Sequence, residues 1–256
     1  MSSVSLVQMR DLIYILTKKE IKTRYKNNAL GYLWSLANPL AYALIFYFAF
    51  KIVFRFDIDN YALFLICGLF PWQWLNNSSV TSANVFLNNT GLIKKAIFPR
   101  YILPVANCIQ EGFHFLMTIP VILVFMMVFS VEMNSSLIIG VPLLFLIQFI
   151  MVVGVSLIVG TLNVFFRDIN YIVQVSFQML FYLTPILYPL SKIPDEYIDY
   201  MLLNPFAPII LCWKGLFLDG MLDSHYVYLS ILYSAVMFAF GVFIYKKLSW
   251  RIAEEM

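Results

Sequence analysis

The sequence predicts an all-α membrane protein with six transmembrane helices and an N-terminal amphipathic helix at the membrane interface. Two observations predict this fold class. Hydrophobic residues make up 62% of the 256 residues and charged residues only 12%, against about 25% charged residues in a soluble domain. Long apolar segments also recur, and a helix needs roughly 20 apolar residues to cross the hydrocarbon layer. We therefore expect lipid to surround most of this protein.

The apolar segments form one membrane domain, which we divide into an arm (1–32), a six-helix bundle (33–247) and a tail (248–256). The predicted spans are residues 33–55, 61–83, 103–130, 137–165, 169–190 and 226–247. The latter half of the second span is polar, so we expect it to face protein or a water-filled path. Residues 204–220 are apolar but interrupted by prolines and Lys214. This pattern favours a re-entrant or interfacial hairpin between the fifth and sixth spans.

The basic residues predict the orientation of the chain. With both termini in the cytoplasm, all but four of the 17 Lys and Arg residues fall on the cytoplasmic side, in agreement with the positive-inside rule. The four on the outer side are Lys51, Arg55, Lys192 and Lys214. The first 32 residues lack the apolar core of a cleavable signal peptide. We expect them to form a cytoplasmic arm.

The arm has the pattern of a helix that lies in the membrane interface. Its apolar residues share one helical face, and its lysines repeat every fourth residue on another. The apolar residues are Met9, Leu12, Ile13 and Leu16, and the lysines are Lys18, Lys22 and Lys26. Such a helix lies with its apolar face down and its lysines near anionic headgroups. The simpler alternative is positive-inside anchoring without a helix.

The predicted cytoplasmic link after the second span, residues 91–100, alternates apolar residues with cations. It ends at Pro99, which stops a helix. This pattern suits a short helix that lies on the membrane surface and docks on a cytoplasmic partner. The alternative is an ordinary basic loop.

Four aromatic residues and one asparagine recur at every fourth position in the first span. The stripe consists of Trp34, Asn38, Tyr42, Phe46 and Phe50. It predicts either a translocation path, where rings stack on sugars, or a face for lipid contact and helix packing. We also expect Trp34, Trp72, Trp74 and Trp250 to sit in the aromatic belts at the interfaces.

The sequence contains little that predicts catalysis. It has no G-x-x-x-x-G-K-[ST] phosphate loop, and its two histidines and three cysteines are scattered, so we expect no metal site and no disulfide framework. Glu111 and His114 share one helix face and serve either an intramembrane function or helix packing. A proton-coupled carrier would need buried titratable groups of this kind. An intramembrane enzyme would need convergent acidic or nucleophilic residues, which the spans lack.

Six segments carry recognisable motifs, in order, over residues 24–215. They are RYKNNALGYLWSLANPL (24–40), GLFPW (68–72), LIKKAIFPR (92–100), the Arg167–Asp168 pair, PILYP (185–189) and Asn204–Pro205. Each motif is weak alone, but together they cover most of the chain. The chain resembles the membrane subunit of a type-two ATP-binding-cassette (ABC) exporter, similar to the O-antigen (Wzm) and teichoic-acid permeases.

The resemblance implies re-entrant helices between spans five and six and a homodimer with the pathway on its two-fold axis. It also implies a separate cytoplasmic ABC ATPase dimer that holds ATP and magnesium, with no cofactor in this chain and no nucleic acid partner. The implied function is export of undecaprenyl-pyrophosphate-linked, O-antigen-like polysaccharide across the bacterial inner membrane. Teichoic acid or another lipid-linked polymer is the alternative substrate. Sugar composition and polymer length stay open.

The resemblance also implies roles for individual residues. The ATPase would dock on Gly91, Leu92, Ile93, Lys94, Lys95, Phe98, Pro99, Arg100, Arg167 and Asp168. The entrance for the lipid pyrophosphate would carry Lys18, Lys22, Arg24 and Lys26. The aromatic stripe of the first span would line the pathway.

Overall fold

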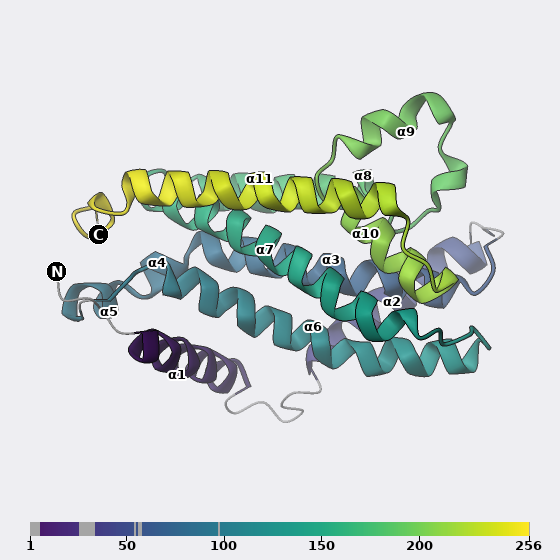
Figure 1. Cartoon of the computed structure of the whole chain (residues 1–256), viewed down its shortest axis with the longest axis horizontal. Helices are drawn as coiled ribbons and strands as arrows, with labels where there is room; N and C mark the ends of the chain where they lie inside the picture. The colour runs from purple at the N-terminus through teal and green to yellow at the C-terminus, as the bar shows by residue number, and fades with distance from the viewer. Residues whose placement is uncertain (1–5, 26–33, 54, 56–57, 97, 256) are drawn as a thin grey trace.

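The computed structural model describes residues 6–25, 34–53, 55, 58–96 and 98–255, and every element in this part of the chain is a helix (Figure 1). Three described helices are long and apolar enough to cross a membrane: α6 (Ile102–Val128), α7 (Ser136–Phe165) and α11 (Ser224–Leu248). The all-helical membrane fold that the composition predicts is therefore confirmed. A helix pair bent by 110° would make a fourth span.

Three further helices lie in predicted spans but do not qualify as long, apolar candidate spans. They are α2 (Trp34–Tyr47), which continues as a π-helical turn (Phe48–Val53), α3 (Tyr61–Ala83) and α8 (Ile169–Leu183). The predicted fifth span, 169–190, is too long, because α8 ends at Leu183. Pro185 explains this end, since a proline disfavours the helical conformation in the residue before it, and Thr184 is extended.

The bent pair occupies the region between α8 and α11. It consists of α9 (Asp195–Leu202) and α10 (Ala207–Lys214), with a π-helical turn (Gly215–Asp219) after α10. Pro208 lies in the first turn of α10, where a proline is tolerated because that amide has no helical acceptor. Gly220 then ends the segment with a φ of 66°, a conformation that favours glycine.

The core is centred on α3, most of whose residues are buried. Pro71 lies inside this helix, and the fully buried Gln148 of α7 donates to its carbonyl at 2.8 Å. Gln148 also accepts from Trp213 Nε1 of α10 at 2.6 Å. One buried amide thereby connects three helices, which matters because a buried polar group without a partner is costly.

The tryptophans of α3 belong to this core and not to an interface belt. Trp72 and Trp74 are only 3% and 2% exposed, so their predicted position was wrong. The Trp74 ring stacks on both Phe115 and Phe145, with centroids 5.2 and 4.7 Å away, and those two rings lie 6.4 Å from each other. Trp34 and Trp250 are exposed, as the belt requires.

Both ends of the described chain lie at one end of the bundle (Figure 1). The same end carries α4 (Val85–Asn88) and α5 (Thr90–Lys95). Helix α1 (Leu6–Tyr25) packs along α6, with Leu16 buried in a cluster that includes Leu103. The predicted arm therefore contains a helix, and one face of that helix packs against the bundle.

Candidate translocation groove and cytoplasmic contact elements

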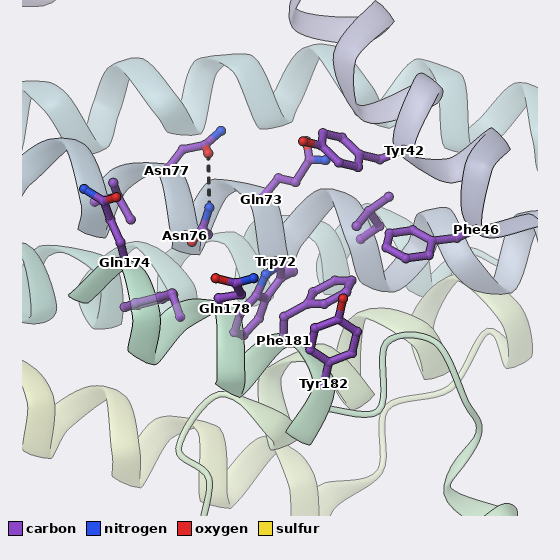
Figure 2. A pocket seen from close by; sticks show the side chains of 13 residues that line it. Tyr42, Phe46, Trp72, Gln73, Asn76, Asn77, Gln174, Gln178, Phe181 and Tyr182 are labelled. Atoms are coloured by element: carbon purple, nitrogen blue, oxygen red, sulfur yellow. Dashed lines mark hydrogen bonds between the residues drawn. The ribbon is translucent and has the colours of Figure 1, made fainter. Parts of the chain in front are cut away.

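A groove of about 480 Å³ opens between α2, α3 and α8. Figure 2 shows Tyr42, Phe46 and Tyr182 toward one end and Asn76, Asn77 and Gln174 toward the other, with Gln73 beside Tyr42 and Gln178 beside Trp72. Its lining residues are Tyr42, Phe46, Leu69, Trp72, Gln73, Asn76, Asn77, Val80, Gln174, Phe177, Gln178, Phe181 and Tyr182. None of these carries a charge, so the groove suits a neutral polar ligand.

The two ends of the groove offer different chemistry. At the aromatic end, the Phe181 ring lies 5.6 Å from Phe46 and 6.0 Å from Trp72, centroid to centroid. Such rings bury the apolar faces of a sugar. At the other end, amides both donate and accept hydrogen bonds, as sugar hydroxyls require. Within the part of the chain that the structure describes, Asn76 Nδ2 bonds only to Asn77 Oδ1, at a long distance of 3.4 Å.

The predicted aromatic stripe reaches this groove in part. Tyr42 and Phe46 line it, whereas Phe50 packs on Tyr61 at a centroid distance of 6.5 Å and Trp34 is half exposed. The Asn38 side chain lies outside the described residues. The stripe bends away because α2 gives way to a π-helical turn at Phe48.

The sequence analysis did not predict that residues of α8 line the groove. Gln174 and Gln178 are four residues apart on one face of an apolar helix, a pattern that could have marked them. The polar half of α3 was predicted to face protein or a water-filled path, and in the structure it faces both other helices and the groove. Ser78, Ser79 and Ser82 are buried among helices, while the amides of the same half line the groove.

A network of amides extends from the groove to the turn between α7 and α8. The buried Asn163 donates to the Ala83 carbonyl at 2.8 Å and to Asn84 Oδ1 at 3.2 Å. Its own oxygen accepts from the Asn170 amide at 3.0 Å. Asn170 Oδ1 accepts from Asn84 at 3.1 Å and from Gln174, a lining residue, at 3.2 Å. The break after α3 and the start of α8 are therefore held together.

The predicted ATPase-contact residues lie at the end of the bundle that holds the termini. Ile93 of α5 and Val164 of α7 belong to one buried cluster, together with Ile252 of the tail. Lys94 and Lys95 are exposed, as are Gly91, Arg167 and Asp168, while Leu92, Phe98 and Pro99 are half-buried. Arg100 Nη1 donates to the Ser249 carbonyl at 2.6 Å, so this residue has a structural role in holding the tail.

The predicted entrance residues lie on or after α1. Lys18 and Lys22 are exposed, and Lys18 Nζ donates to Tyr14 Oη at 3.3 Å. The Arg24 side chain and Lys26 lie outside the described residues. Glu111 and His114 are both buried in α6.

Comparison with known proteins supports a transporter. The family model of ABC-2 type transporters matches residues 11–218. The chain is 46% identical to the O-antigen export system permease protein RfbA of Klebsiella pneumoniae over 95% of this chain and 94% of the relative. It is 31% identical to the RfbA protein of Myxococcus xanthus, over 86% and 85% of the two chains. The polysialic acid transport protein KpsM of Escherichia coli is 22% identical over 75% of each chain.

These findings confirm the family that the motifs predict, and they identify a membrane component of a transporter. ATP binding in such a system falls to a separate subunit. The chain belongs to the ABC-2 type transporter family, as a membrane permease subunit.

Proposed function

We propose that this chain is the permease of an ATP-driven exporter that moves undecaprenyl-pyrophosphate-linked, O-antigen-like polysaccharide from the cytoplasm across the inner membrane. The two RfbA relatives are O-antigen export system permeases by name. The observation that carries the proposal is the groove of amides and aromatic rings, because its chemistry fits a sugar polymer and its lining residues carry no charged side chain.

The proposal includes the finer architecture. Helices α2, α3 and α8 complete a set of six spans, both termini face the cytoplasm, and the α9–α10 pair re-enters the membrane from outside. Two copies form a homodimer whose grooves face a shared pathway, and a cytoplasmic ATPase dimer binds α5 and the α7–α8 turn. The amide network supports this arrangement, since it connects that turn directly to Gln174 of the groove.

Two alternatives differ in substrate or in energy source. A capsule-type or teichoic-acid polymer would suit the same groove, and KpsM, a polysialic acid transport protein, is a more distant relative. A proton-coupled carrier would depend on buried Glu111 and His114, but neither residue lines the groove.

Complementation tests the proposed function. This chain and its cognate ATPase are expressed in a Klebsiella pneumoniae strain that lacks its own O-antigen permease, and surface O-antigen is measured by immunoblot. We expect surface polymer to return, and to disappear when the phosphate loop of the ATPase is inactivated. A stable complex that restores no polymer would contradict the proposal. Export that survives ATPase inactivation but stops with a protonophore, at normal ATP levels, would favour the carrier.

A further inference from the structure

A second pocket, of about 530 Å³, lies between α1, the end of α3 with α4, and α6. We call it the α1–α6 pocket. Its polar lining includes Lys19, Thr81, Asn88, Asn107, Gln110 and Glu111, and no aromatic side chain lines it. Its volume falls within the range of about 300–1,000 Å³ that is usual for small-ligand sites.

Gln110 is the residue that points to a ligand. It is only 6% exposed and lines the pocket, yet its side-chain amide makes no hydrogen bond to any residue that the structure describes. Nearby Asn107 shows the opposite situation, because its Nδ2 contacts Ser82 Oγ and Thr81 Oγ1, each at 2.9 Å. The Gln110 amide is not among the fully buried polar atoms without a partner in the described part of the chain. It therefore reaches the surface of the pocket, where it is available to a hydroxyl-bearing ligand.

The pocket adjoins the groove along α3. Thr81, which lines the pocket, donates to the carbonyl of Asn77, a groove residue, at 2.6 Å. The pocket also lies toward the end of the bundle that holds the termini, beside α4. A ligand in it would therefore occupy the cytoplasmic approach to the groove.

The lining chemistry selects the ligand class. An amide and a carboxylate, Gln110 and Glu111, offer acceptors and a donor for neighbouring hydroxyls. Lys19 is exposed at the rim and presents an ammonium, which suits a phosphate attached to the same sugar. A pocket without aromatic side chains cannot stack on a polymer, so hydrogen bonding to one sugar residue is its main capability.

We propose that the α1–α6 pocket binds the first sugar residue of the lipid-linked substrate, with Gln110 and Glu111 on its hydroxyls and Lys19 toward the adjoining phosphate. This inference rests on the proposed export function and assigns it a recognition site distinct from the groove.

The test uses the purified complex of this chain with its ATPase in nanodiscs. The two probes are undecaprenyl pyrophosphate and the same lipid carrying one N-acetylhexosamine. We expect the sugar-bearing lipid to bind about tenfold more tightly, the effect of one or two additional hydrogen bonds. Gln110→Leu should remove this preference and leave the affinity for the bare lipid unchanged.

Gln110→Leu should still fold, because it places an apolar side chain at a buried position. Gln110→Met is a second variant, with a side chain closer to the length of Gln. Asn134→Leu is the control, because Asn134 is exposed between α6 and α7 and lines neither the pocket nor the groove; this variant should keep the preference. Equal binding of the two probes by the wild type, or a preference that survives in both Gln110 variants, would overturn the site. Either result would leave the export function standing if complementation succeeds.

Discussion

Lys214 is a buried lysine that stabilises the end of a helix. Its side chain is 5% exposed, and its Nζ donates to the carbonyls of Pro185 and Ile186 at 2.5 and 2.8 Å. The Nζ also lies 3.4 Å from the centroid of the Phe64 ring, within the range of a cation–π contact. The carbonyls after α8 have no further helical turn to accept from, so Lys214 attaches this segment to α10.

Replacing Lys214 tests that attachment. Lys214→Met retains most of the side-chain length but leaves two buried carbonyls without donors, and we expect a loss of about 1–3 kcal/mol in stability. The measurement is the thermal unfolding midpoint of the purified protein in detergent. Lys192→Met is the control, because Lys192 is exposed and its replacement should change stability by at most about 0.5 kcal/mol. Equal midpoints for the two variants would refute the attachment.

The role of Lys214 could not be predicted from the sequence. There it marked only an interruption of an apolar segment, because its partners lie 28 and 29 residues away. Trp72 and Trp74 show the same limit. Composition predicts that a tryptophan in a membrane protein prefers an interface, but the rings of Phe115 and Phe145, from two other helices, bury Trp74 instead.

The crossing of α7 and α11 depends on two glycines. A Cβ on Gly154 would lie 2.6 Å from backbone atoms of Met237 and Phe238, and one on Gly241 would lie 2.4 Å from the Gly154 carbonyl oxygen. Ser234 Oγ donates to the Ile147 carbonyl at 2.8 Å across the same interface. Small residues that permit such close approach are the usual basis of helix association in lipid.

Adding one methyl group tests this crossing. In Gly154→Ala the new methyl meets backbone, which cannot rotate away, so we expect a loss of about 1–3 kcal/mol. Gly91→Ala is the matched control, because nothing lies within 4 Å of a Cβ at that position in α5. Its stability should be unchanged or slightly raised. Thermal unfolding of the two variants in detergent makes the comparison, and a Gly154 variant as stable as the Gly91 variant would exclude close packing.

Helix positions were largely predictable, whereas the groove was not. The predicted spans 61–83 and 137–165 agree with α3 and α7 to within a residue, because long apolar segments determine where these helices lie. The groove needs the relative rotation of α2, α3 and α8, which depends on contacts between distant residues. Local sequence therefore identified Tyr42 and Phe46 but not their amide partners on α8.

At the scale of the whole molecule, the end that holds the termini behaves as one unit. Leu16, Ile93, Val164 and Ile252 come from α1, α5, α7 and the tail and share one buried cluster. A force applied to α5 would therefore reach the α7–α8 turn through packed side chains. The amide network begins at that turn and ends at Gln174, so the end of the bundle and the groove are physically continuous.

If this end of the bundle binds the ATPase through α5, the exposed lysines of α5 should contribute more to ATPase binding than those of α11. Lys94 and Lys95 are both exposed on α5, whereas Arg100 holds the tail through Ser249, so the test changes the two lysines and leaves Arg100 in place. We expect Lys94→Glu with Lys95→Glu to reduce co-purification of the ATPase at least several-fold, since two charges change sign at a docking surface. Lys246→Glu with Lys247→Glu makes the same change on α11 at the same end and should have little effect. Equal recovery of the ATPase with both double variants would mean that α5 is not the docking element.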